Sequence, residues 1–234
     1  MALILNIETA TDVCSVALAL DGKIVAIREE LSGQSHARLL TTFISECMKE
    51  AGFQLNDLNA VAVSKGPGSF TGLRIGVASA KGLCYALDKP LLSVNTLQSM
   101  ASNFLLHNKV ESDTWLCPMI DARRMEVYTA FFNTDLEFEK DTVAEVIEPG
   151  SFQEILNQHR VFFFGDGMEK TRQIFENHPN AIFNAVVQPS SAGMIQFSEE
   201  SYKNGLFEVV AYFEPYYLKD FFTGGQPSVP SLRQ

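Results

Sequence analysis

The chain has 234 residues and is acidic, with 28 Asp and Glu against 18 Lys and Arg and a formal net charge of −10. Unaided binding to nucleic acid depends on Lys and Arg that neutralise phosphates, so we expect any role with nucleic acid to need a partner that supplies a basic surface. Hydrophobic residues make up 46% of the chain, which excludes a disordered protein and is enough for one large domain or two smaller lobes.

The cysteines and the apolar runs indicate a reduced protein without a membrane span. No CxxC pair or Cys/His cluster occurs, which argues against a zinc knuckle, and we expect ordinary buried thiols. The opening stretch MALILNIETATD lacks a basic start and breaks at Asn6 and Glu8, so it predicts a first strand rather than a signal peptide. No stretch is apolar for long enough to cross a bilayer. We therefore expect a cytoplasmic protein with no membrane attachment.

The first half of the chain predicts three strands followed by alternating helices and strands. The pair Asp21-Gly22 is a hairpin signal between the second and third apolar runs. Gly52 is a candidate C-cap for the first helix, and Asn95 is a candidate N-cap for the third. The expected elements are strands at residues 2–8, 13–20, 23–31, 60–64 and 91–94, and helices at 36–51, at about 69–86 and from Thr96.

The second half predicts a rougher repeat of the same order. EPGSFQEILNQ reads as a helix with a proline and a serine cap, and SSAGMIQFSEESYKNG reads as a further capped helix. VFFF followed by Gly165-Asp166-Gly167 aligns by pattern with VAVS and the glycine turn of the first half. The expected strands are TWLCPMI, MEVYTAFF, a segment near 137–147, VFFF and AIFNAVV, with a further helix at MEKTRQIFEN.

Two copies of the order βββαβαβα predict a two-lobed α/β fold of the ribonuclease-H-like superfamily, which includes actin and the sugar kinases. We place the first lobe at residues 1–107, as the partner-binding lobe, and the second at 108–234, with the join at the polar stretch NKVESD. In active members of this superfamily a phosphate-bearing ligand lies between the lobes, so the glycine turns are candidate phosphate sites.

The residues around these turns fit phosphate binding poorly. Neither a P-loop nor a dinucleotide fingerprint is present in SKGPGSFTGLRIG, because the required Lys and Gly are absent. Glu8 stands in the first hairpin where actin-like proteins have an Asp followed by glycine, and no glycine follows it. Glu8, Gly165 and Gly167 are kept as candidate cofactor-binding residues, but we favour glycine turns that only let a strand reverse into a helix.

Two predicted helices have more apolar or small residues than one core face requires. The helix at about 69–86 carries an apolar stripe with Gly72 and Gly76 beside it, and a glycine inside a helix costs about 1 kcal/mol relative to alanine. We expect the approach of another helix to compensate for that cost. The apolar residues of 36–51 cover almost half of that helix. Either the helix is deeply buried or it shows a second face to a partner, and we favour a partner.

Several stretches resemble the TsaB family, also called YeaZ. They are SKGPGSFTGLRIGVASAKGLCYALDKPLLSVNTLQSMA, ILNIETATDVCSVAL, SHARLL, MIDARRMEVY and PYYLK. The resemblance is dense through residue 101 and thinner in the second lobe. It implies an actin-like fold and a role as the non-catalytic paralogue of TsaD, the transferase that installs threonylcarbamoyl on the tRNA adenosine next to the anticodon. It also implies a heterodimer with TsaD, which the ATPase TsaE joins.

The resemblance also indicates that a metal site is lost. In TsaD the junction that matches SVNTLQSMA carries two histidines one helical turn apart, and these histidines bind the metal. This sequence has Thr96 and Met100 there, and neither replaces an imidazole on a hard or borderline metal. No two of its histidines are three to five residues apart. We therefore predict no metal site and no catalytic residue.

The predicted function is that of a scaffold subunit. It would bind TsaD through its first-lobe helices, recruit TsaE, meet tRNA only through the complex, and form a homodimer when alone. No resident cofactor is predicted, and ADP or ATP at the interface of the complex is left open. The predicted interface residues are His36, Leu39, Leu40, Phe43, Cys47, Gly72, Leu73, Gly76, Val77 and Ala80.

Two alternatives come from other classes of protein. One is a small-molecule kinase of the same superfamily, which needs a glycine phosphate turn that residues 8–13 lack. The other is a glycoprotease-like metallohydrolase, which needs the metal pair that Thr96 and Met100 replace. Asp121 and Arg123 in IDARR could bind a ligand at the cleft mouth, although a turn with a local ion pair is favoured.

Overall fold

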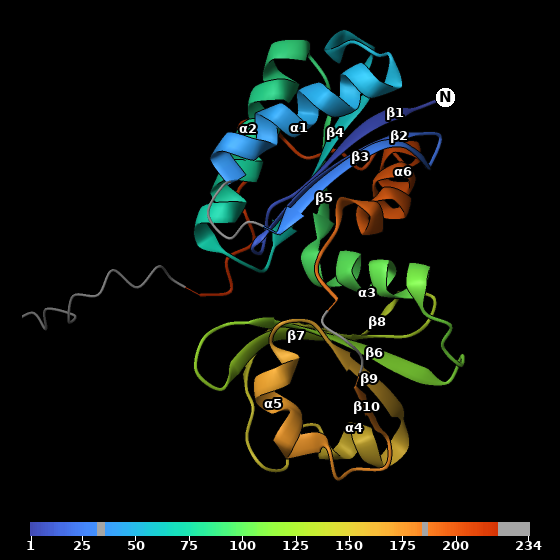
Figure 1. Ribbon diagram of the computed structural model, residues 1–234, viewed down its shortest axis with the longest axis vertical. Coiled ribbons are helices and arrows are strands. Elements are labelled where there is room, and N and C mark those ends of the chain that lie inside the picture. The colour runs from blue at the N-terminus through green and yellow to red at the C-terminus, as the bar shows by residue number, and fades with distance from the viewer. Residues whose placement is uncertain (32–35, 184–186, 220–234) are drawn as a thin grey trace, which may run out of the picture.

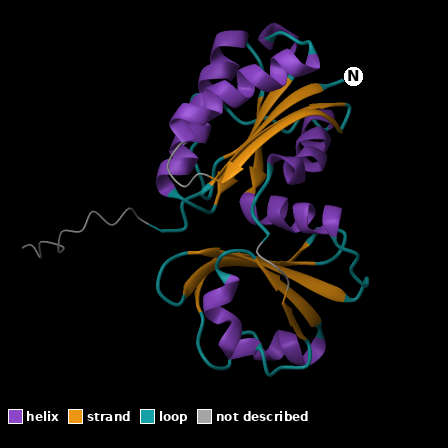
Figure 2. Ribbon diagram, viewed as in Figure 1, coloured by secondary structure: helices purple, strands orange, loops and turns teal. Residues whose placement is uncertain are grey.

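The computed structural model describes residues 1–31, 36–183 and 187–219. Within these residues the chain folds into two lobes, each built on a five-stranded mixed sheet (Figure 1). Figure 2 shows helices on both faces of each sheet and one helix between the lobes. None of the helices within the described ranges is both long enough and apolar enough to cross a membrane.

The first sheet has the strand order β3-β2-β1-β4-β5. β1 is antiparallel to β2, β2 is antiparallel to β3, and the β1, β4 and β5 strands are parallel. Each predicted strand of the first half is confirmed. The strands are β1 (Leu3–Glu8), β2 (Val13–Leu20), β3 (Lys23–Leu31), β4 (Ala60–Gly66) and β5 (Leu91–Asn95).

The second sheet repeats this topology. Its order, β10-β9-β6-β7-β8, read from its other edge, places each strand as in the first sheet, so the duplicated α/β fold is confirmed. The predicted strand at 181–187 is formed only at 181–183, and residues 184–186 lie outside the described residues. The strands are β6 (Thr114–Asp121), β7 (Glu126–Phe132), β8 (Phe138–Val146), β9 (Arg160–Phe164) and β10 (Ala181–Phe183).

The helices begin and end largely where the sequence predicts. Gly52 has φ +74° after α1, and the side chain of Asn95 accepts hydrogen bonds from two N–H groups of α3, so both predicted caps are confirmed. The helices are α1 (His36–Ala51), α2 (Phe70–Leu87), α3 (Thr96–His107), α4 (Gln153–Gln158), α5 (Met168–Phe175) and α6 (Ile195–Lys203), with 3₁₀ turns η1 (Leu55–Asp57) and η2 (Ser191–Met194).

Two predicted helix starts in the second half are wrong. α4 is preceded by Phe152, which is in the left-handed region and provides no side-chain cap. The hydroxyl of Ser151, the predicted cap, accepts a hydrogen bond from the Glu148 N–H instead. The segment 190–205 is not one helix. Ser190 caps the 3₁₀ turn η2 through the Ala192 N–H, and α6 begins only at Ile195. A Cβ on Gly193 would overlap the Ser99 carbonyl of α3, so this turn fits tightly against α3.

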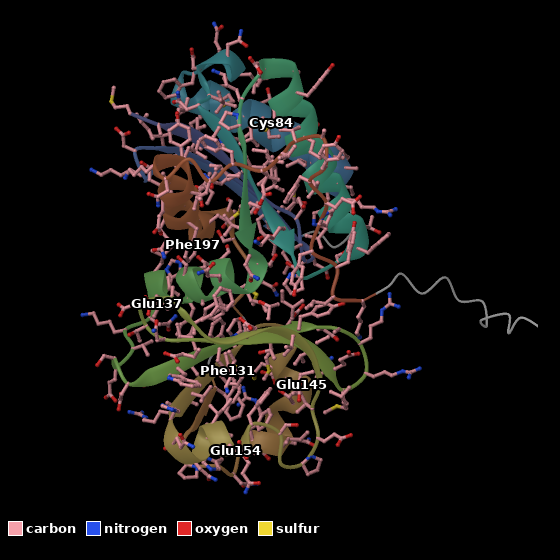
Figure 3. All side chains as sticks on the ribbon, turned by 180° about the vertical axis from the view of Figure 1, so that it is seen from behind. Cys84, Phe131, Glu137, Glu145, Glu154 and Phe197 are labelled. Atoms are coloured by element: carbon pink, nitrogen blue, oxygen red, sulfur yellow. The ribbon has the colours of Figure 1, made fainter. Side chains whose placement is uncertain are left out.

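The helices pack across the predicted boundary between the lobes. α1 and α2 cover one face of the first sheet, and η2 with α6 covers the other. α3 packs on the second sheet, where Phe104 stacks on Phe164 with ring centroids 4.4 Å apart. Phe197 of α6 contacts the cores of both lobes, and Figure 3 shows it at their junction. The division at 107/108 therefore separates the two sheets, but α3 and α6 each cover the opposite sheet.

All four cysteines are buried and free, as the sequence predicts. Burial raises the pKa of the Cys14, Cys47 and Cys84 thiols to about 11, and it raises that of Cys117 further. The thiols are therefore protonated and inert at neutral pH.

A segment without helices follows α6 and runs back along the first lobe. We call residues 206–219 the C-terminal strap. Glu208 donates its N–H to Leu91 O in an isolated bridge, and Lys81 of α2 donates to the carbonyl oxygens of Ala211 and Phe213. This part of the strap is therefore held against β5 and α2.

Candidate functional site

A cleft of about 610 Å³ lies between the two lobes. The first lobe contributes residues 10–12 of the β1–β2 turn and residues 67–71 at the start of α2. The second lobe contributes residues 120–123 of the β6–β7 turn, Tyr128 and Asp166, and the strap contributes residues 216–219. This volume is within the usual range of small-molecule sites, so the chemistry of the lining decides what the cleft does.

Glu8 is fully buried at the end of β1 and does not line the cleft. Burial raises its pKa to about 7, although hydrogen bonds from Ala10, Ser64 and Thr9 oppose this shift. Its Oε1 accepts the Ala10 N–H at 2.6 Å, and its Oε2 has no hydrogen-bond partner among the described residues. Glu8 is therefore an acid enclosed by its own chain rather than a ligand aimed at a cofactor.

The glycines of α2 accommodate the turn formed by Thr9 and Ala10. A Cβ on Gly72 would overlap the Thr9 carbonyl, and one on Gly68 would overlap the Ala10 carbonyl. The Thr9 hydroxyl donates to Gly72 O at 2.9 Å. The sequence predicts the close approach of another helix at Gly72 and Gly76. This prediction is wrong, because Thr9 in the turn of the same chain lies against both glycines.

The glycines of α2 provide a matched stability test. Gly72→Ala is expected to lower the free energy of unfolding by about 2 kcal/mol, because the new methyl group collides with backbone that has little room to move. Gly82→Ala in the same helix is expected to raise it by about 1 kcal/mol, because nothing lies within 4 Å of its added Cβ. Urea denaturation measures both, and a loss at Gly82 equal to that at Gly72 would contradict this packing.

The glycines of the second-lobe turn also pack against their own lobe. Gly165 has φ +101°, and a Cβ there would overlap the Met119 carbonyl; Gly167 lies against Ile120 and Val127. Asp166 Oδ1 accepts the Asp121 N–H at 3.0 Å. Gly165 and Gly167 thus let β6 approach closely, and their role toward a cofactor stays a prediction.

The positions that correspond to metal-binding histidines in the resembling transferases are filled differently. Thr96 and Met100 are fully buried at the start of α3, and the Met100 methyl group lies close to Gly165. Their hydroxyl and thioether groups suit a divalent metal poorly. Among the described residues, no group of three or more His, Cys, Asp or Glu side chains is placed to hold a metal ion.

The four histidines lie in separate places. His36 is buried at the start of α1 with its Nε2 3.1 Å from Val13 O. His159 stacks on Trp115 with centroids 4.0 Å apart, and His178 lies 3.4 Å from Asn157 Oδ1. His107 is at the end of α3.

Two successive arginines occupy the β6–β7 turn at the cleft. Arg123 has φ +71° and Arg124 has φ +51°, a left-handed backbone that costs a residue other than glycine about 1 kcal/mol. Asp121 stabilises the turn by accepting the Arg123 N–H at 2.6 Å and the Lys170 ammonium at 2.5 Å. Burial would raise the pKa of Asp121, but these contacts and the positive charges of Lys170 and Arg123 lower it.

The end of the strap ties the two lobes together beside this turn. Tyr216 donates its N–H to Lys65 O at 2.6 Å in the first lobe. Lys219 donates to Ala122 O at 3.2 Å and forms an ion pair with Glu126 in the second lobe. Neither the strap nor this tie is predicted from the sequence, because the segment has no helical or strand periodicity.

The ten predicted interface residues all face inward. Each is buried within this chain, including Leu40 at 1% exposure and Gly76 under Thr9. The apolar stripes of α1 and α2 thus cover the first sheet. These side chains are therefore not available to a partner in the folded chain. An interface on these two helices must use their outward sides.

The outward sides of α1 and α2 differ in chemistry. On α1 the outward residues are polar, and Glu46 and Glu50 form ion pairs with Arg28 of β3. On α2 a row of exposed residues at helical spacing includes Gly82, with no atoms above it, and Tyr85, at 87% exposure. We call this row the α2 outer face, and it consists of Thr71, Arg74, Ala78, Gly82 and Tyr85.

Comparison with known proteins identifies relatives along nearly the whole chain. The model of the family TsaD, described as tRNA N6-adenosine threonylcarbamoyltransferase, matches residues 26–205. The tRNA threonylcarbamoyladenosine biosynthesis protein TsaB of Escherichia coli K12 is 31% identical over 222 residues, which cover 93% of this chain and 94% of that protein.

Solved structures agree with these relatives. YeaZ from Pseudomonas aeruginosa is 26% identical, with 93% of this chain and all of that chain covered and a TM-score of 0.80. The activator of 2-hydroxyisocaproyl-CoA dehydratase from Clostridium difficile is 10% identical, with coverage of 87% and 97% and a TM-score of 0.52. The second structure shows the shared actin-like fold alone.

Proposed function

We propose a scaffold function for this chain, which belongs to the TsaB family of tRNA threonylcarbamoyladenosine biosynthesis proteins. In this proposal the chain is a non-catalytic subunit that binds a TsaD-like transferase and holds it in a competent arrangement. The complex recruits a TsaE-like ATPase, and tRNA meets the chain within the complex. ADP or ATP at the interface of the complex is compatible with this role.

The observation that carries the proposal is the packing of the Thr9–Ala10 turn on α2. Backbone carbonyls of this turn lie where a phosphate would need free N–H groups and room near Gly68 and Gly72. Ser69 also donates its own N–H to Ala10 O at 2.6 Å, so this N–H is not available to a phosphate. The space beside these glycines is occupied by backbone of the same lobe. This packing supports a lobe that acts by contact with a partner and does not bind phosphate.

The α2 outer face is the surface that we assign to the transferase. Small residues such as Ala78 and Gly82 let a partner helix approach closely, and the exposed ring of Tyr85 offers apolar area at its end. When the chain is alone, the same face would pair with a second copy. This assignment keeps the predicted helix α2 and replaces the buried residues of the predicted interface with exposed ones.

The two alternative functions have little support in these side chains. A kinase would need a carboxylate that reaches the ligand, and Glu8 is enclosed behind the Thr9–Ala10 turn. A metallohydrolase would need imidazoles at Thr96 and Met100, both of which are fully buried. ATP turnover or peptide cleavage by the purified chain would favour these alternatives.

Reconstitution tests the proposal directly. Threonylcarbamoylation of a tRNA transcript is measured with the transferase and the ATPase, with and without this chain. We expect a large rise in rate when the chain is added and no transfer by the chain alone. Full activity of the other components without this chain would contradict the scaffold function.

A further inference from the structure

The Arg123–Arg124 turn presents two guanidinium groups that form no ion pair within the described residues, although the charge of Arg123 contributes to the lowered pKa of Asp121. Two of the nearby carboxylates are already paired with lysines, Asp121 with Lys170 and Glu126 with Lys219. Within the described residues, neither guanidinium takes part in an ion pair or a hydrogen bond. In a chain of net charge −10, two adjacent unpaired arginines are a local reversal of sign.

The backbone of this turn is unfavourable for the residues that it carries. Hairpin turns that need left-handed φ values usually contain Asn or Gly, and this turn has Arg at both positions. Asp121, Lys170 and Asp166 hold the turn through hydrogen bonds to its backbone or its flanks. Such a strained but well-held backbone is typical of functional positions, where the side chains are needed.

The surroundings of the turn favour an extended anion over a small one. Arg123 lines the cleft, whereas Arg124 is exposed and lies outside the lining. Asp12, Asp121 and Asp166 also line the cleft, so a small free phosphate bound within it would meet negative charge. An extended anion that crosses the cleft edge would reach both Arg123, which lines the cleft, and the exposed Arg124, which a small ion held within the lining would not.

Aromatic side chains lie beside the arginines. Tyr128, Tyr216 and Tyr217 line the same cleft, and Tyr217 lies 4.9 Å from Phe70, measured between ring centroids. Aromatic rings stack with bases that are not paired, and arginine contacts phosphates, which is the usual combination in single-stranded RNA recognition. The combination fits a loop of RNA better than a duplex.

We propose that the Arg123–Arg124 turn binds the phosphate backbone of single-stranded RNA at the mouth of the cleft. The inference rests on the proposed function, in which the complex acts on an adenosine beside the tRNA anticodon. It assigns to this chain a direct contact with the tRNA, in place of a contact made only by its partners.

The test uses the complex of this chain with its transferase and a fluorescein-labelled, unmodified tRNA transcript. Anisotropy gives Kd at several KCl concentrations for wild type and for Arg123→Gly/Arg124→Gly. We expect Kd to rise at least about tenfold, and the slope of log K against log salt to fall by about 2, because two phosphate contacts are lost. The Arg123→Lys/Arg124→Lys variant should keep most of that slope.

Stability separates this role from a structural one. Glycine adopts the left-handed backbone without strain, so the Gly variant should melt no lower than wild type while it binds tRNA more weakly. A control, Lys23→Ala/Lys203→Ala, removes the same charge from residues that do not line the cleft and should leave Kd unchanged. A variant that melts lower than wild type, or a control that loses as much affinity, would overturn the proposal.

The other outcomes are equally decisive. Sedimentation first shows whether this chain and the transferase form a heterodimer, so a failure of the scaffold function is detected separately. The tRNA titration is then made on the species that forms, either the heterodimer or the free chain. An unchanged Kd and salt slope for the Gly variant would overturn the proposal. If these arginines bind ADP or pyrophosphate but not tRNA, the proposal is also overturned. Loss of the heterodimer in the Gly variant would overturn it as well.

Discussion

Gly82→Arg is expected to weaken the proposed association of this chain with a TsaD-like transferase at least about 100-fold. Gly82 lies on the α2 outer face, between Ala78 and Tyr85, with open space above it, so in the free chain an arginine there reaches solvent. In the complex the same side chain would have to be buried against the partner helix, where an unpaired charge costs several kcal/mol. A 100-fold change in Kd corresponds to about 2.7 kcal/mol.

The folded chain itself should tolerate this substitution. Arginine favours a helix over glycine by roughly 1 kcal/mol, so the free energy of unfolding of the variant should equal or exceed that of wild type. The control is Gln173→Arg, an exposed position on α5 of the second lobe, which should bind the transferase like wild type. Calorimetric titration gives both values of Kd, and unchanged binding by Gly82→Arg would show that the α2 outer face is not the interface.

Glu8→Gln is expected to make the chain more stable than wild type at pH 8 and to remove a pH dependence. The pKa of Glu8 rises from 4.5 to about 7 on folding because the side chain is buried. The folded chain therefore holds a proton that the unfolded chain releases, and stability falls as pH increases from about 4.5 to 7. The full cost, about 3 kcal/mol at 1.36 kcal/mol per pKa unit, is present above pH 7.

The measurement compares two pH values, so that constant effects of the amide cancel. Urea unfolding of wild type and Glu8→Gln is recorded at pH 4.5 and pH 8. The advantage of the variant should grow by about 3 kcal/mol between them, because other titrating groups are common to both proteins. Parallel stability curves would mean that Glu8 is ionised in the folded chain and interacts with a cation or ligand.

The sequence predicts the helices and strands well because the apolar pattern that marks each element is also what drives its burial on folding. Strands β1 and β2 are runs of apolar residues that the sheet buries on both faces, and Asn95 and Gly52 cap helices by local chemistry that the sequence contains in full. The repeat of strand order also follows from pattern alone. Packing of α6 on the first sheet depends on contacts between distant segments, so no local pattern predicts it.

The ten predicted interface side chains are buried within this chain for a physical reason. Apolar periodicity marks the face of a helix that leaves water, and in α1 and α2 that face covers the chain's own sheet. The opposite face of α2 carries small residues that add little to a hydrophobic pattern. Ala78 and Gly82, four residues apart opposite the apolar stripe, are the sequence signal for the outer face that we propose as the interface.

Glycine spacing is similarly ambiguous without a structure. Gly72 and Gly82 occupy the same helix, yet one is covered by Thr9 and the other by nothing. The sequence also places Arg123 at the cleft mouth through the hairpin between two predicted strands. The sequence does not reveal the left-handed backbone of Arg123 and Arg124. A predicted hairpin turn that lacks Gly and Asn does, however, indicate that other residues must adopt left-handed φ values there.

The rate of tRNA threonylcarbamoylation in the reconstituted system is the most direct test of the claim that this chain acts by contact. Four reactions are compared: no chain, wild type, Gly82→Arg, and Glu8→Gln combined with Asp12→Asn. If the chain acts as a scaffold, the reaction with Gly82→Arg should be as slow as the reaction without the chain. The reaction with the carboxylate variant should be as fast as that with wild type. A carboxylate variant that still assembles with the transferase but fails to support the reaction would contradict the scaffold function.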